Sequence, residues 1–142
     1  MMISTKGRYA LRVMIDLAEQ QRAEYVPLKE IAARQEISQK YLESIMVILS
    51  KNNFIEALHG KGGGYRLNRE PKDYKVGDIL RLTEGTLAPV ACLGDDAKPC
   101  EKTAECRTLP VWENLYNLII NYLDSVTIAD LVKNELPDNY VI

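Results

Sequence analysis

The sequence predicts a mainly α-helical fold that contains one small β-hairpin. Two observations lead to this class. Apolar residues recur at the three- and four-residue spacing of amphipathic helices over most of the 142 residues, whereas residues 54–67 read as two short strands joined by a glycine-rich turn. The hydrophobic share of 46% and the charged share of 27% are typical of a soluble globular protein of one or two small modules.

Neither a membrane span nor a signal peptide is expected. A helix that crosses a bilayer needs about 20 consecutive apolar residues, and the longest unbroken apolar run here covers only residues 45–49. The first ten residues contain no apolar stretch of the kind found in signal peptides. We therefore expect a cytoplasmic protein whose three cysteines do not form structural disulfides.

Three N-terminal segments are predicted to be helices. Residues 6–21 carry an apolar stripe preceded by hydroxyl residues that suit an N-cap, and residues 27–35 begin with a proline, which suits a first helical turn. Residues 38–51 follow, with Ser38 as N-cap and apolar residues on one face. Two short helices joined by a tight turn predict a helix-turn-helix. The outer face of its second helix carries four polar side chains, Gln39, Lys40, Glu43 and Ser44.

A small hairpin, here called the wing, directly follows this helix-turn-helix. Phe54–Leu58 and residues 65–67 are the predicted strands, and glycine dominates the turn between them. An isolated turn of this kind is usually only a surface turn, but after a helix-turn-helix it is placed to lie on the DNA groove beside the one that the helix enters. The turn is surrounded by side chains that carry or can carry positive charge, His59, Lys61, Arg66 and Arg69.

An irregular loop with all the cysteines is expected between two further helices. Residues 76–82 predict a fourth helix that Gly85 ends, and residues 88–109 show no periodicity. A structureless segment of this length is usually disordered or functional, and three thiols in one loop favour a function. Thiolates suit soft iron centres, so we expect metal or redox chemistry here. The cysteines are Cys92, Cys100 and Cys106.

The longest apolar stripe of the chain lies near its C-terminus. Trp112, Leu115, Ile119 and Tyr122 recur at helical spacing, and further apolar residues beside them widen the stripe. A domain this small cannot cover so wide a stripe, so we expect this long helix to pack against its copy in a homodimer. Residues 127–130 have the spacing of a capping box and predict a last short helix.

Charge is divided unevenly along the chain. The formal net charge is -2, but residues 1–70 carry +3 and residues 71–142 carry -5. The basic half suits contact with a polyanion such as DNA. We therefore divide the chain into a winged helix-turn-helix DNA-binding region, residues 1–70, and a region with the cysteine sensor loop and the dimerisation helices, residues 71–142.

Four motifs in the same order resemble those of the Rrf-type winged-helix regulators. They are residues 3–10, residues 37–43, the wing residues 60–65 and the cysteine loop before Trp112. Within this family the likeness is to the IscR-like iron-sulfur cluster regulators, with NsrR-like and CymR-like regulators as relatives. The resemblance implies a bacterial homodimer that binds double-stranded operator DNA and regulates transcription.

The resemblance also implies which residues contact DNA. Lys40, Glu43 and Ser44 are expected to read bases in the major groove, with Ser38 and Tyr41 near the phosphates. The chemistry agrees, because a lysine pairs with guanine acceptors and a glutamate accepts from the cytosine amino group. The wing residues expected at the flanking groove are His59, Lys61, Gly62 and Gly63.

The resemblance further implies an iron-sulfur cluster, of the 2Fe-2S kind, held by the three cysteines and an unidentified fourth ligand. His59 stands where IscR-like wings begin with an arginine, and Leu109 stands where IscR-like loops have a histidine ligand. NsrR-like relatives use an acid where this chain has Arg8. Two alternatives stay open for the loop: a thiol sensor that forms a disulfide between two of the three cysteines, and cysteines that bind zinc or are inert.

Enzymatic activity is not expected. The single histidine lies in the wing, and the sequence offers no nucleophile paired with a base. A small iron-sulfur electron carrier would not need a capped helix and a glycine wing in tandem. The competing regulator is a cluster-free, CymR-like repressor controlled by thiol oxidation or by a protein partner.

Overall fold

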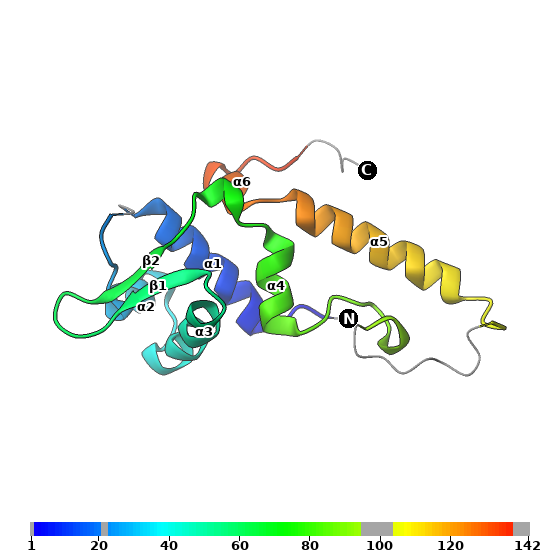
Figure 1. Cartoon of the computed structure of the whole chain (residues 1–142), viewed down its shortest axis with the longest axis horizontal. Coiled ribbons are helices and arrows are strands. Elements are labelled where there is room, and N and C mark those ends of the chain that lie inside the picture. Colours follow the sequence, from blue (N-terminus) through cyan, green and yellow to red (C-terminus); the bar gives the residue numbers. More distant parts are fainter. Residues whose placement is uncertain (1, 21–22, 95–103, 138–142) are drawn as a thin grey trace.

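The computed structural model describes residues 2–20, 23–94 and 104–137, and it confirms a mainly helical fold with one antiparallel hairpin. Figure 1 shows the hairpin and helices α1 to α4 gathered in one body, from which helix α5 projects. The elements in chain order are α1 Thr5–Glu19, α2 Leu28–Gln35, α3 Gln39–Lys51, β1 Ile55–Leu58, β2 Gly64–Leu67, the 3-10 turn η1 Pro71–Asp73, α4 Val76–Glu84, the 3-10 turn η2 Ala91–Leu93, α5 Leu109–Ser125 and α6 Ile128–Lys133.

The serine caps predicted for α1 and α3 both form. Ser4 Oγ accepts a hydrogen bond from the Gly7 amide at 3.1 Å, and Ser38 Oγ accepts one from the Tyr41 amide at 3.2 Å. Each cap satisfies an amide that the first helical turn would leave unpaired. Pro27 differs from the prediction, because it is the extended N-cap of α2 rather than its first helical residue.

A buried carboxylate joins α1 to α2. Asp16 is 4% exposed and accepts hydrogen bonds from Arg34 Nε at 3.0 Å, Arg34 Nη2 at 2.8 Å and Gln35 Nε2 at 2.8 Å. The hydrogen bond with Asp16 is the main cause that raises the pKa of Arg34. Directly after this contact, Glu36 takes a left-handed conformation with φ 55° and Ile37 is buried, which turns the chain into α3.

The wing is fixed to the helices by a short contact before α2. Strands β1 and β2 pair with Ile55 opposite Leu67, and Val26 forms a bridge with Tyr65 through N–O distances of 2.8 and 2.9 Å. Gly64, at φ 155°, permits this approach, because a Cβ atom there would collide with the Val26 carbonyl. The wing and the start of α2 are therefore held together by backbone hydrogen bonds.

Tyr74 holds the base of the wing. Its side chain is fully buried, and its hydroxyl oxygen accepts hydrogen bonds from the Asn68 amide at 3.0 Å and the Arg69 amide at 3.1 Å. The same hydroxyl lies 2.8 Å from the Phe54 carbonyl oxygen. One tyrosine thus connects the strand that enters the hairpin to the segment that leaves it.

An ion pair and a small apolar cluster attach α5 to α4. Arg81 donates to the two carboxylate oxygens of Asp124 at 2.9 Å each and to Asp78 at 3.0 Å. The hydrogen bond with Asp124 is the main cause that raises the pKa of Arg81. The buried members of the adjoining apolar cluster are Val76, Leu80, Leu87 and Val126.

Helix α6 packs back on the N-terminal body. The predicted capping box forms, with Thr127 Oγ1 accepting from the Asp130 amide at 3.2 Å and Asp130 Oδ2 accepting from the Thr127 amide at 2.9 Å. Ile128 is fully buried in the main core, together with Tyr74 and Ile79. Residues beyond position 70 therefore complete the core of the winged-helix body.

Helix α5 is poorly covered by its own chain. The structure describes all of Leu109–Ser125, and none of these residues is buried. Figure 1 shows that the C-terminal end of α5 meets the body while its N-terminal end points away from it. Three large apolar side chains on it are open to solvent, with exposed fractions of 56% for Val111, 39% for Leu115 and 64% for Leu118.

The two 3-10 turns were not predicted, because three-residue turns leave no periodic signal in a sequence. Helix α5 also begins at Leu109, earlier than the apolar stripe indicates, with Pro110 in its first turn. Over the described residues, the helices are too short or too polar for any of them to cross a lipid bilayer.

The buried carboxylate gives a stability prediction. Asp16→Ala leaves Arg34 and Gln35 without their shared acceptor, so the free energy of unfolding should fall by about 2 to 3 kcal/mol. Urea unfolding followed by circular dichroism measures the change. Glu19→Ala, at an exposed position of the same helix, is the matched control and should change the free energy by less than about 0.5 kcal/mol. Equal effects of the two substitutions would contradict a stabilising role for the Asp16 contacts.

Candidate DNA interface and cysteine loop

The outer face of α3 presents polar side chains to solvent, as predicted. Lys40, Glu43 and Ser44 are exposed, and Ser44 Oγ donates a hydrogen bond to the Tyr41 carbonyl at 2.6 Å. The hydroxyl proton of Ser44 is thereby used, and its oxygen remains able to accept. Ser38 is exposed, and its oxygen caps the helix. The face therefore offers one amine, one carboxylate and one acceptor hydroxyl within about one helical turn.

Tyr41 is held by α1 and is only half-exposed. Its ring meets the ring of Tyr9 edge to face, with centroids 5.9 Å apart. The Arg12 guanidinium carbon lies 4.9 Å from the ring centroid of Tyr9, and Arg12 Nε donates a hydrogen bond to Gln35 Oε1 at 3.1 Å. These contacts fix the first turn of α3 against α1 and the end of α2.

The wing tip exposes His59, Lys61 and Gly62, whereas Gly63 is partly covered. Gly62 has φ 78°, a left-handed conformation that glycine adopts without strain, and the Gly63 amide donates to the Gly60 carbonyl at 3.0 Å. The turn is therefore narrow, and two groups that can carry positive charge flank it.

The two arginines that the sequence places around the wing have structural partners. Arg66 pairs with Glu56 on the opposite strand at 2.8 Å and lies 4.3 Å from the ring centroid of Tyr25. Arg69 lies 4.7 Å from the ring centroid of Phe54. The hairpin register would have identified the Glu56–Arg66 pair, but no local pattern marks the position of Arg69.

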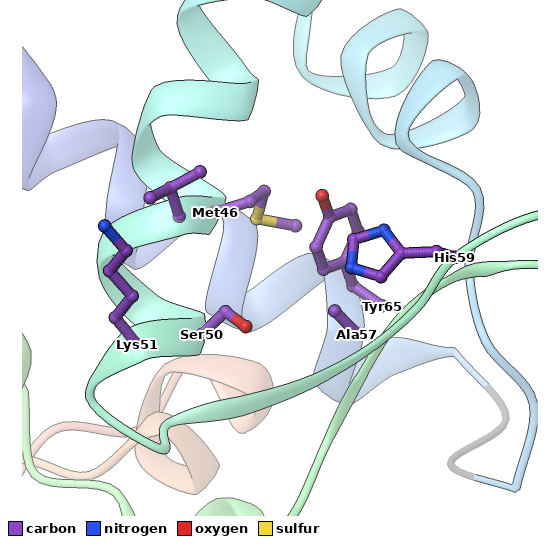
Figure 2. Close-up of a pocket in the computed structure, with 7 residues that line it drawn as sticks. Met46, Ser50, Lys51, Ala57, His59 and Tyr65 are labelled. Atoms are coloured by element: carbon purple, nitrogen blue, oxygen red, sulfur yellow. The ribbon is translucent and has the colours of Figure 1, made fainter.

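A cleft of about 180 Å³ separates the C-terminal half of α3 from the wing. Figure 2 shows Met46, Ser50 and Lys51 of α3 along one side and Ala57, His59 and Tyr65 of the hairpin along the other. Burial is the main cause that raises the pKa of Tyr65, and the Glu43 carboxylate adds to the shift. Sequence reasoning missed this cleft, because it depends on the angle between two elements.

The cysteine loop is described only in part. Cys92 lies exposed in η2, Cys106 is half-exposed just before α5, and both are free thiols. Cys100 lies outside the described residues. The Cys106 sulfur is 3.5 Å from Thr108 Oγ1, and this hydrogen bond is the main cause that lowers the pKa of Cys106. In the part of the chain that the structure covers, no group of three or more His, Cys, Asp or Glu side chains is arranged to hold a metal ion.

Hydrogen bonds connect the segment just before this loop to the start of α1. Glu84, the last residue of α4, accepts hydrogen bonds from the Ser4 amide at 2.9 Å and from Ser4 Oγ at 2.7 Å. Gly85 follows with φ 79° and begins the loop. No local pattern predicts this contact, because 80 positions separate the two residues.

The four residues predicted for dimerisation do not share one environment. Ile119 and Tyr122 pack against the apolar cluster between α4 and α5, whereas Leu115 is exposed and Trp112 half-exposed. The solvent-facing apolar surface of α5 in a single chain instead consists of Val111, Leu115 and Leu118.

Comparison with known proteins identifies the family. The model of the Rrf2 family, described as an iron-dependent transcriptional regulator, matches residues 3–134. The chain belongs to the Rrf2 family. The Rrf2 resemblance found in the motifs is thus confirmed, and so is the winged-helix fold with its long C-terminal helix.

Named relatives of this Rrf2 chain are regulators. The HTH-type transcriptional regulator IscR of Escherichia coli is 33% identical over 135 residues, which are 95% of this chain and 82% of that protein. The solved structure of T. potens IscR is 38% identical, with a TM-score of 0.73 and coverage of 94% and 88%. That of CymR, the global cysteine regulator of B. subtilis, is 34% identical, with a TM-score of 0.75 and coverage of 94% and 98%. The protein is a transcriptional regulator and not an enzyme, as expected.

The Cys106 contact predicts an unusually reactive thiol. Because the Thr108 hydrogen bond lowers the pKa of Cys106, more of this thiol is ionised near pH 7, and the thiolate is the form that reacts. In the metal-free protein, Thr108→Ala should slow alkylation of Cys106 by iodoacetamide at pH 7 and leave the rate at pH 10 unchanged. Peptide mass spectrometry measures the rate at each cysteine. Thr108→Ser should restore it, and equal rates for all three proteins at pH 7 would contradict the assignment.

Proposed function

We propose that this Rrf2 protein is an IscR-like regulator that binds operator DNA as a homodimer and senses iron-sulfur cluster or redox status through its three-cysteine loop. The observation that carries the proposal is the exposed polar face of α3 beside a narrow, glycine-rich wing. A helix with such a face enters the major groove in helix-turn-helix proteins, and the wing then reaches the flanking groove.

In this proposal, the α3 face reads sequence and the wing adds affinity. Lys40, Glu43 and Ser44 contact base edges, because an amine, a carboxylate and an acceptor hydroxyl distinguish the donors and acceptors of the major groove. Ser38 and Tyr41 lie near the phosphates at the start of α3. The wing contacts come from His59, Lys61, Gly62 and Gly63.

The reading role of Glu43 is testable by selection. Glu43→Ala should change the sequences that the protein selects from a random duplex library, because loss of the carboxylate removes an acceptor for cytosine and a repulsive group for acceptor edges. Lys61→Ala is the contrasting variant. It should leave the selected sequence unchanged and weaken binding to all duplexes by the same factor. The negative slope of log affinity against log salt should become smaller in magnitude by about one unit. An unchanged selected sequence for Glu43→Ala would contradict the reading role.

We further propose that α5 forms the dimer interface. A solvent-exposed row of Val111, Leu115 and Leu118 is costly on a monomer, and a second copy of the helix covers it by symmetry. Trp112 lies beside this row, while Ile119 and Tyr122 support the helix from the α4 side. The division at residue 70 is then one of role, DNA reading before it and sensing and dimerisation after it.

The dimer interface predicts a change in mass. Leu118→Glu should convert the protein to monomers in sedimentation experiments at micromolar concentration, because it places a charge in the apolar interface. Its side chain is 64% exposed in the single chain, so the fold should remain intact by circular dichroism. Asn117→Glu, the neighbouring exposed position, is the control and should leave the dimer unchanged. A Leu118→Glu protein that remains dimeric would exclude this interface.

For the sensor, we propose that Cys92, Cys100 and Cys106 hold a 2Fe-2S cluster with a fourth ligand from elsewhere. The donor set fits such a group, since the two described thiols are free and accessible and the hydrogen bond with Thr108 lowers the pKa of Cys106. When bound, a cluster supplies a structural link between loop segments that depends on iron supply and oxidants. The Ser4–Glu84 contact carries a change in the loop to α1, which contacts α2 and, through the Tyr9–Tyr41 ring pair, α3.

The cluster proposal is decided by analysis of anaerobically purified protein. Iron and acid-labile sulfide should be present in equal amounts, and Cys92→Ala should remove both, together with the visible absorption. The CymR likeness supports the alternative, a repressor without a cluster that responds to thiol oxidation or to a protein partner. Protein with neither iron nor sulfide, whose operator affinity changes after treatment with peroxide, would favour that alternative and contradict the cluster.

A further inference from the structure

We propose that the cleft between α3 and the wing binds one sugar-phosphate unit of the DNA backbone. This inference rests on the proposed DNA binding and adds a site to it. Four polar groups from two elements line the cleft: Ser50 and Lys51 of α3, Tyr65 of β2, and His59 at the end of β1. Each of these side chains can donate a hydrogen bond, which is what a phosphate oxygen requires.

The walls of the cleft match both parts of this ligand. Met46, Val47 and Ala57 provide apolar surface between the polar groups, which suits the carbon atoms of a deoxyribose. Among the described residues that line the cleft there is no carboxylate, and Lys51 supplies a positive charge. An amphipathic ligand with one negative charge therefore fits the cleft better than a purely apolar or a cationic one.

The charges on the neighbouring elements support an anion. Lys61 lies on the turn that follows His59. Lys29 lies in the first turn of α2, next to Leu28, and Leu28 and His59 both line a second pocket. Burial is the main cause that raises the pKa of Tyr65, and the negative charge of Glu43 on α3 adds to the shift. Two further carboxylates on these elements, Glu30 of α2 and Glu56 of β1, are paired with Arg34 and Arg66.

The size and place of the cleft exclude a typical small-molecule effector. Its volume of about 180 Å³ is below the roughly 300–1,000 Å³ of most ligand pockets. If α3 enters the major groove and the wing lies on the flanking groove, the strand that separates the two grooves must pass between them. The cleft lies along that path, with a wall from each element (Figure 2).

The test combines a change in the protein with a change in single phosphates. The wild-type protein first selects a duplex from a random library, and each backbone phosphate of that duplex is then replaced in turn by an uncharged methylphosphonate. At one position in each half-site, the methylphosphonate should lower the affinity of the wild-type protein by about five- to tenfold. Lys51→Met should lower affinity for the unmodified duplex by up to a similar factor and should lose less than the wild-type protein does at that position.

Control variants separate the cleft from general electrostatics. Lys72→Met removes an exposed charge from η1, a turn that packs against α6, and should remain sensitive to the same phosphate. Tyr65→Phe and Ser50→Ala retain the apolar walls and should each weaken binding by about two- to fivefold, and each should show a smaller loss than the wild-type protein at that position. If Lys51→Met shows the full wild-type loss at every methylphosphonate, the site is wrong although DNA binding stands. A wild-type protein that selects no duplex would overturn both proposals.

Discussion

The contacts of Asp16 with Arg34 and Gln35 are the interaction on which the position of α3 depends. A carboxylate that is 4% exposed needs its partners, because an unpaired charge at such a site is costly. Those partners occupy the last turn of α2, immediately before the left-handed residue Glu36 that starts the connection to α3. The direction of α3 is thus set by a charge-assisted contact of fixed geometry rather than by apolar packing alone, which tolerates small shifts.

Helix α1 is the element through which the functional regions are connected. Ser4 at its start contacts Glu84 beside the cysteine loop, Tyr9 contacts the ring of Tyr41, and Asp16 contacts α2. The segment before the cysteine loop is therefore linked to α2 and α3 through this one helix, which contacts a different element at each of the three points.

Short-range signals predicted most of the fold. Ser38 and the apolar spacing of Leu42, Ile45 and Leu49 define α3, and the Thr127–Asp130 capping box defines α6, because both involve residues within about three turns of each other. The structural partners of Arg69 and the orientation of Ile119 toward α4 were not predictable, since tertiary neighbours decide them.

The candidate site divides in the same way. The polar face of α3 and the glycine turn are local features and could be predicted from the sequence. The cleft between Lys51 and His59 and the Ser4–Glu84 contact arise only when distant segments meet. The motifs of a winged helix were sufficient to indicate the family, whereas the neighbours of each charged side chain depend on the tertiary structure and could not be predicted.

The attachment of α5 by its C-terminal half leaves its N-terminal half as a lever arm. Its 17 residues span about 25 Å at 1.5 Å per residue, and its contacts with the body extend from Tyr116 to the Arg81–Asp124 pair. A rotation of about 10° at that junction displaces the opposite end by about 4 Å, a distance comparable to the rise of one base pair. In the proposed homodimer, such a rotation would move α3 of one chain relative to α3 of its partner by about the spacing of one base pair along the bound DNA.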